Sequence, residues 1–180
     1  MVMLKKIILI LCCAPLLARN LYITRSGAVS FYSHAPMEDI AAVNKQASCV
    51  LDLETGSFAF QVPIRGFVFP NALMQEHFNE NYLESHQFPK ATFKGNIDHW
   101  LELDLGPNPQ DVAVTGTLTI HGVSREISES GALARAGDGI NGLATFEVAP
   151  ADYDIRIPKI VRNNIARIIQ VTVNVKLQQK

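Results

Sequence analysis

Three segments of the chain alternate strictly between apolar or small residues and polar ones. Residues 111–120 place threonines between valine, glycine, leucine and isoleucine, and residues 140–148 and 169–177 show the same period of two. Side chains of a strand point alternately to its two faces, so this pattern buries one face and leaves the other in water. The three segments therefore predict strands of an antiparallel sheet.

Six further segments alternate less regularly and predict additional strands: residues 28–33, 47–52, 57–63, 91–97, 100–105 and 125–133. Turn-forming residues separate several of them, as at 54–56, 106–109 and 137–139. So many strands at short spacing are typical of a sandwich or an up-and-down barrel.

Residues 71–83 interrupt this pattern. Apolar and aromatic side chains recur at helical spacing from 73 to 82, and Asn71 precedes them as an N-cap. The segment predicts a helix that covers one end of a barrel. A second, shorter helix is expected around 160–165.

The first residues have the layout of a secretory signal peptide. Two lysines precede an uncharged apolar run at 7–17, which is shorter than the ~20 residues of a bilayer span. We expect residues 1–18 to be removed after Ala18, with Ala14 as the second choice. A single domain at 19–180 would then be periplasmic or secreted. An uncleaved membrane anchor is the alternative.

The three cysteines divide between this leader and the domain. Cys12 and Cys13 lie in the predicted signal, where acylation would make a lipoprotein, but Leu11 stands where a small residue is expected. Cys49 then remains alone, so no internal disulfide forms. The apolar run around Cys49 predicts a buried small hydrophobe rather than a reactive thiol.

Composition narrows the classes of function. The chain has 180 residues, enough for one domain with a core, and it carries 18% charged residues and a formal net charge of −1. Acids and bases are interspersed, without the basic stripe of a nucleic-acid binder or a polybasic patch for anionic membranes. We expect no nucleic-acid partner and no stable membrane insertion after signal cleavage, while a homodimer stays open.

No motif predicts catalysis or metal binding. The five histidines are scattered, and the chain has no His-x-His, His-Glu-x-x-His or Gly-x-Ser-x-Gly sequence. Two alternatives stay open, namely a metal site built from chain-distant histidines and a Ser–His pair of His121 and Ser124. We expect no catalytic residue, no metal and no cofactor.

An eight-stranded barrel either fills its interior with side chains or leaves room for one ligand. The predicted inner faces mix large residues with glycine and alanine, which leaves volume that aromatic rings would line. The expected lumen residues are Phe31, Phe58, Phe60, Phe93, Val114, Gly116, Leu118, Gly142, Ala144 and Phe146, with Gly116, Gly142 and Ala144 at the widest part. The alternative is that the glycines mark bulges or tight bends over a filled core.

Two stretches, 67–95 and 115–123, carry a resemblance to a known family. The positions that carry it are His77, Phe88, Pro89 and Phe93 in the first stretch, and Gly116, Leu118, Thr119, His121, Gly122 and Val123 in the second. In both, the chain resembles the YceI-like family of secreted lipid-binding proteins. The resemblance extends over nearly the whole of the expected mature chain.

The resemblance implies an all-β fold, a lipocalin-like extended antiparallel barrel of about eight strands with one helix covering one end. It also implies a hydrophobic lumen that holds a polyisoprenoid, such as an isoprenoid quinone or a prenyl lipid, without catalysis. His77, His121 and Gly122 carry over as signature positions, and we expect both histidines to be hydrogen-bonded structural residues. Two alternatives remain: a lipid hydrolase or isomerase that uses His77 or His121 as general base, and a filled structural barrel without ligand.

Overall fold

The computed structural model describes residues 20–180, so the expected signal peptide lies outside the described residues. Most of this part of the chain is in nine strands: β1 (Leu21–His34), β2 (Asp39–Asp52), β3 (Ser57–Pro63), β4 (Phe67–Val68), β5 (Lys90–Ile97), β6 (Gln110–Ile120), β7 (Val123–Ala136), β8 (Gly139–Val148) and β9 (Ile169–Gln179). All of their pairings are antiparallel. Eight of the nine predicted strand segments are confirmed, most of them with longer bounds.

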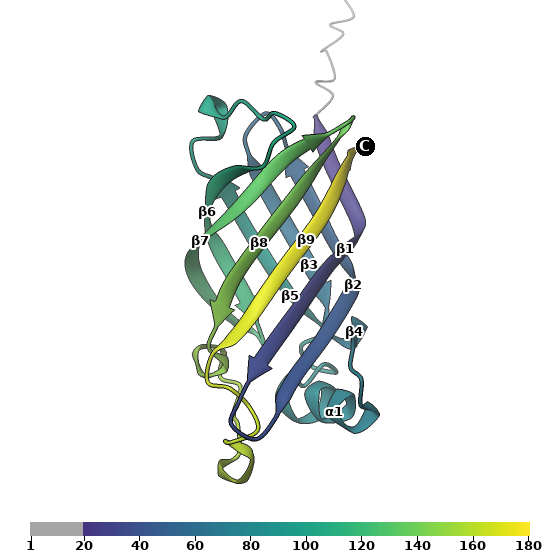
Figure 1. Cartoon of the computed structure of the whole chain (residues 1–180), viewed down its shortest axis with the longest axis vertical. Coiled ribbons are helices and arrows are strands. Elements are labelled where there is room, and N and C mark those ends of the chain that lie inside the picture. Colours follow the sequence, from purple (N-terminus) through teal and green to yellow (C-terminus); the bar gives the residue numbers. More distant parts are fainter. Residues whose placement is uncertain (1–19) are drawn as a thin grey trace, which may run out of the picture.

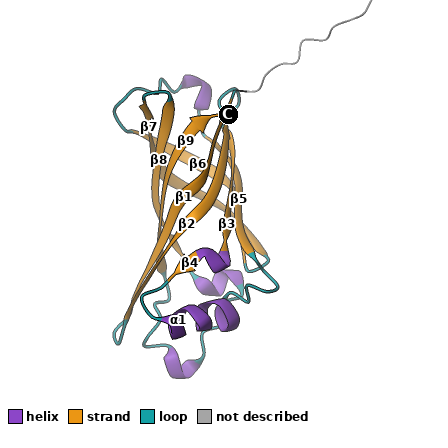
Figure 2. Cartoon of the chain, turned by 90° about the vertical axis from the view of Figure 1, so that its right-hand side faces the viewer, coloured by secondary structure: helices purple, strands orange, loops and turns teal. Residues whose placement is uncertain are grey.

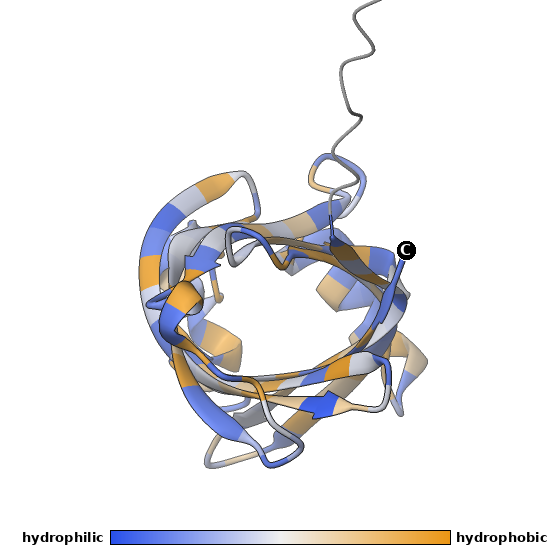
Figure 3. Ribbon diagram, turned by 90° about the horizontal axis from the view of Figure 1, so that it is seen from above, coloured by the Kyte–Doolittle hydropathy of each residue, from blue (hydrophilic) through white to orange (hydrophobic). Residues whose placement is uncertain are grey.

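Eight of these strands close into a barrel. In the order β1-β9-β8-β7-β6-β5-β3-β2 each strand pairs with the next, and β2 pairs with β1 to complete the ring. Figure 1 shows the strands running obliquely along a tall barrel, and Figure 3 shows the closed ring from above. The short β4 follows the 3-10 turn η1 (Ile64–Gly66) and pairs only with β2. The predicted antiparallel barrel is therefore confirmed.

The prediction of a strand at 100–105 is wrong. The chain enters this segment through His99, at φ 53°, and forms the 3-10 turn η3 (Trp100–Glu102). Trp100 Nε1 donates a hydrogen bond to the carbonyl oxygen of Leu53 at 2.8 Å, and the indole packs against the core at one end of the barrel. The alternation in the sequence arises here from side chains that close the barrel end, not from a strand face.

The predicted helix is confirmed, in two parts. α1 (Ala72–His77) begins after Asn71, whose Oδ1 accepts a hydrogen bond from the backbone N–H of Leu73 at 2.8 Å. A π-helical turn, η2 (Phe78–Tyr82), continues it. Figures 1 and 2 show α1 at the end of the barrel opposite the C-terminus, where it forms a cap.

The barrel wall is incomplete between β7 and β8. Their hydrogen-bonded pairs end at Gly131 and Ala144, so the first half of β7 has no partner on β8. The chain that follows β8 lies beside this part of β7 as the 3-10 turn η4 (Pro150–Tyr153). Arg125 Nε donates to the carbonyl oxygen of Asp152 at 2.9 Å and joins the two segments.

The connection from β8 to β9 forms the other side of the cap. The helix expected at 160–165 is only the single 3-10 turn η5 (Lys159–Val161), because Asn163 and Asn164 favour turns over a continuing helix. The backbone N–H of Met37 donates to the carbonyl oxygen of Asn163 at 3.0 Å and ties the loop to the β1–β2 hairpin. Among residues 20–180 no helix is long and apolar enough to cross a membrane.

Candidate ligand-binding cavity

A cavity of about 440 Å³ runs through the interior of the barrel. Its wall is built by all eight barrel strands, the cap helix and the β8–β9 loop. This volume falls within the roughly 300–1,000 Å³ of small-molecule sites. Nine of the ten expected lumen residues lie on the wall: Phe31, Phe58, Phe60, Phe93, Val114, Leu118, Gly142, Ala144 and Phe146. Contact between these residues and a ligand stays a prediction.

Gly116 is not among the described residues of the wall, contrary to our expectation. It pairs with Gly95 across β5 and β6, and a Cβ at either position would overlap a backbone carbonyl of the neighbouring strand. A Cβ at Gly116 would also lie 2.8 Å from Cζ of Phe93, because this ring covers both glycines. The two glycines make room for the Phe93 ring and leave no volume for a ligand, so the glycine at this position serves a close approach between the ring and the backbone.

Sequence reasoning omits the inner face of β9 from the lumen. Val171, Val173, Val175 and Leu177 all line the cavity. Their period of two is visible in the sequence and is the signal that identifies them. Residues that pair directly across two strands point to the same face of the sheet. Glu129 on β7 pairs with Val114 on β6, which faces inward, so Glu129 also lies on the inner face.

Four aromatic rings pack together on the cavity wall near the cap. The Phe31 ring lies with its centroid 5.4 Å from Phe67, 5.7 Å from Phe69 and 5.5 Å from Phe78. All four line the cavity. Each such aromatic pair contributes ~0.5–1.5 kcal/mol to the free energy of unfolding beyond the burial of its surface. The cluster therefore stabilises the contact between the cap and the barrel. Phe67 and Phe69 lie outside any periodic segment, and no sequence signal points to their place on the wall.

The charge on the wall has one sign. Glu38 and Glu129 are its acidic residues, and no lysine or arginine is among the described residues that form it. Asn164 Nδ2 donates to Oε2 of Glu38 at 3.3 Å at the cap end. An anionic group inside the cavity would therefore find no opposite charge on this wall.

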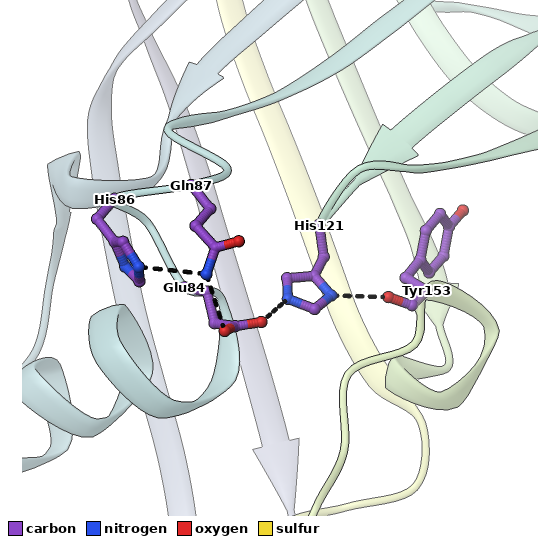
Figure 4. A network of polar contacts seen from close by, with 5 residues as sticks. All are labelled: Glu84, His86, Gln87, His121 and Tyr153. Carbon is purple, nitrogen blue, oxygen red and sulfur yellow. Dashed lines mark hydrogen bonds and ion pairs between the residues drawn. The ribbon is translucent and has the colours of Figure 1, made fainter.

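His121 joins three loops at the cap end of the barrel. Its Nδ1 lies 3.2 Å from the carbonyl oxygen of Tyr153, and its Nε2 lies 2.8 Å from Oε2 of Glu84 (Figure 4). The ring packs against Phe88 with centroids 4.5 Å apart, and the His121 side chain is 11% exposed. His121 is hydrogen-bonded between loops and is not among the described residues that line the cavity.

Gly122 allows the turn that places this imidazole. His121 and Gly122 are the two residues between β6 and β7, with φ of 50° and 76°. Positive φ at both central residues defines a type I′ turn, which matches the twist of a hairpin and favours glycine. A Cβ at Gly122 would lie 2.6 Å from Cε1 of Phe88, so the ring beneath His121 also requires glycine here.

His77 differs from our expectation. It is the last residue of α1, is exposed, and lines the cavity. Its ring is exposed and has no hydrogen-bond partner among the described residues. Neither histidine combines a place on the wall with a partner there: His121 has Glu84 but lies outside the wall, and His77 lies on the wall without a hydroxyl or carboxylate partner. A general base must lie within hydrogen-bond reach of the proton that it abstracts, and of these two histidines only His77 lies on the cavity wall.

Cys49 is buried on β2 and lines the cavity, which confirms a buried small hydrophobe. Burial raises the pKa of the Cys49 thiol to about 12, so the thiolate is scarce at neutral pH. Within residues 20–180 no three His, Cys, Asp or Glu residues gather closely enough to hold a metal ion.

Residues 24–177 match the family model of the YceI-like domain. No curated protein matches the chain in sequence.

Solved structures share the fold. A polyisoprenoid binding domain from Saccharophagus degradans, implicated in plant cell wall breakdown, is 15% identical with a TM-score of 0.77, over 90% of this chain and 99% of that one. BcnA from Burkholderia cenocepacia is 16% identical with a TM-score of 0.70, over 85% and 96%. The YCEI protein of Campylobacter jejuni is 18% identical with a TM-score of 0.58, over 76% and 83%. At these identities the likeness shows the fold alone.

Proposed function

The chain belongs to the YceI-like family, and we propose that it is a non-catalytic binding protein that holds a long apolar lipid in the barrel cavity. The observation that carries this proposal is the cavity itself, whose wall is almost wholly apolar. The ligand is a polyisoprenoid, such as an isoprenoid quinone or a prenyl lipid. The polyisoprenoid binding domain from S. degradans, which shares this fold, supports that choice. The nine lumen residues on the wall contact the tail.

Burial of the tail provides enough free energy for useful affinity. About 20 carbons at 0.8 kcal/mol each contribute roughly 16 kcal/mol before costs. Association costs ~4–15 kcal/mol, which leaves at most about 12 kcal/mol and an upper limit near nanomolar affinity. One methylene changes the affinity by only ~1–3 kcal/mol, so the cavity discriminates tail length weakly.

The head group of the ligand is neutral. A phosphate or carboxylate beside Glu38 or Glu129 would be repelled, and no described lysine or arginine of the wall would compensate. A quinone carbonyl or an alcohol carries no charge. Its hydrogen-bond partners at the cap end are Asn164 and His77, both of which line the cavity.

Native mass spectrometry of the protein purified under non-denaturing conditions, followed by organic extraction, tests the proposal. The expected result is one neutral polyisoprenoid per chain. A bare chain that also takes up neither geranylgeraniol nor a prenylated quinone would contradict lipid holding. A bound fatty acid or prenyl phosphate would leave lipid holding intact and contradict the neutral head group.

The rival function is a lipid hydrolase or isomerase in which His77 or His121 acts as general base. His77 is the histidine that reaches the cavity, so His77→Ala is the informative variant. We expect it still to hold lipid through the contacts of the tail, with an affinity lowered about tenfold or less by the lost head-group hydrogen bond. Turnover of a prenyl ester by the wild type, lost in His77→Ala, would favour the enzyme instead.

Export is part of the proposal. We expect residues 1–18 to direct the chain to the periplasm or the medium and to be removed there. Cell fractionation with intact-mass measurement tests this, and the expected mass corresponds to a chain that starts at residue 19. A membrane-bound chain that retains residues 1–18 would favour the uncleaved anchor.

A further inference from the structure

The β8–β9 connection at 155–168, here called the basic loop, concentrates positive charge. This segment carries four cations and no acid, while Asp152 and Asp154 precede it in the same connection; the cations are Arg156, Lys159, Arg162 and Arg167. All four are exposed, and the ion pairs among the described residues all involve histidine, so none of the four is neutralised in this way. The formal net charge of −1 for the whole chain therefore conceals a local excess of positive charge in this loop.

Large apolar side chains are exposed on the same surface. Ile160 is 91% exposed in the middle of the basic loop, and Ile168 at its end is 54% exposed. Met37 is 71% exposed. It lies beside the loop, since its backbone N–H donates a hydrogen bond to the carbonyl oxygen of Asn163. Figure 1 shows this loop at the lower end of the molecule, reaching beyond α1. Exposed apolar residues among cations are typical of segments that enter the interface of anionic bilayers.

The other side of the basic loop is part of the cavity wall. Ile155, Ile157, Val161 and Ile165 line the cavity. Hydrogen bonds hold the loop in this position, since Ala166 N–H donates to Ser33 Oγ at 2.9 Å. One short segment thus lines the cavity with its inner side and presents cations to solvent with its outer side. A surface that contacts the loop would lie next to the cap end of the cavity.

We propose that the basic loop docks the protein onto the surface of an anionic phospholipid bilayer, with the cap end of the barrel facing the membrane. Charge complementarity selects this partner, because phosphate groups neutralise the four exposed cations while Ile160 enters the interface. The inference rests on the proposed lipid-holding function, since a water-insoluble ligand has to be taken from or delivered to a membrane. Docking is peripheral and differs from insertion, which the chain has no described helix to perform.

Co-sedimentation with vesicles tests the docking. One set holds equal parts of phosphatidylglycerol and phosphatidylcholine, and the other holds phosphatidylcholine alone. The wild type is expected to bind the anionic vesicles, more weakly as salt is raised, and to bind the neutral ones poorly. The wild type and all variants are expressed from the same full-length sequence and purified in the same way, so differences among them report on the loop.

Each cation removed lowers the partition coefficient about fivefold, so Lys159→Gln/Arg162→Gln is expected to bind about 25-fold more weakly. Ile160→Ser is expected to lower binding about tenfold or more. Lys94→Gln/Lys176→Gln is the matched control, because it removes the same charge from exposed positions on the outer barrel wall. The control is expected to bind like the wild type.

Equal binding to both vesicle types, unchanged binding of the loop variants, or an equal loss in the control overturns the docking. Lipid extracted from each variant is measured in parallel, and its amount is expected to match the wild type. If neither the wild type nor any variant holds lipid while binding to the two kinds of vesicle is as expected, the docking stands and the proposed function fails. If lipid is held but no vesicles bind, the docking fails and the proposed function stands.

Discussion

Replacing Ala144 with phenylalanine would place an aromatic ring in the proposed ligand volume. Ala144 lies on the inner face of β8 and lines the cavity. Its neighbours across the two adjacent strands are Gly131 and Val173. Because Gly131 has no side chain, the new ring would extend into space that no neighbouring side chain of β7 fills.

The magnitude follows from the volume that the ring takes. A benzyl group displaces about one five-carbon isoprene unit, and five carbons at ~0.8 kcal/mol each amount to about 4 kcal/mol, or a thousandfold in affinity. The free energy of unfolding without ligand is expected to change little, because the ring enters a cavity. In a filled core the same change would overpack the interior and cost ~1–3 kcal/mol.

The assay combines thermal melts of the delipidated protein with geranylgeraniol titration followed by native mass spectrometry. Thr145→Phe is the control, because Thr145 is the next residue along β8 and is exposed on the outer face. It adds the same ring without entering the cavity and is expected to bind normally. A large loss of stability in Ala144→Phe with unchanged lipid binding would refute the reasoning.

Three further predictions concern stability and reactivity. Gly116→Ala is expected to lower the free energy of unfolding by about 1–3 kcal/mol in denaturant titrations, because its Cβ meets the backbone of β5 and the Phe93 ring; an unchanged midpoint would contradict this close approach. His121→Ala is expected to cost about 1–3 kcal/mol by the same measurement, since it removes two hydrogen bonds of a nearly buried ring. The exposed pair of His34 and Asp39 is the contrast, and His34→Ala should leave the midpoint unchanged. Cys49 should resist alkylation in the folded protein at pH 9 and react readily in denaturant, because burial raises its thiol pKa to about 12 from ~8.5 when unfolded. The contribution of the protonated Cys49 thiol to the free energy of unfolding is then complete below about pH 8.5 and declines as pH rises toward 12, because the thiol of the unfolded chain ionises first. Rapid alkylation of the native protein would contradict the burial of Cys49.

A residue of the cavity wall could be predicted from the sequence where the alternation within its own strand shows which way its side chain points. Phe58 and Phe60 could be assigned to the lumen because the parity of one strand suffices. Gly116 could not, because the space beside an inward glycine depends on a ring from the next strand, that of Phe93. Phe67 and Phe69 reach the wall from an irregular connection, where no period relates sequence to direction.

The sequence by itself determined that this is an antiparallel β protein and which face of each strand is apolar, since side-chain direction along a strand follows from backbone geometry. It also determined where the cap helix begins, because the Asn71 side chain bonds its own first turn. Only the tertiary structure decided that β1 meets β9, that 100–105 closes a barrel end, and that the basic loop lies at the cap end of the cavity. These features depend on contacts between residues distant in the chain, such as Glu38 and Asn164, and a local pattern carries no information about which distant segment will supply the partner.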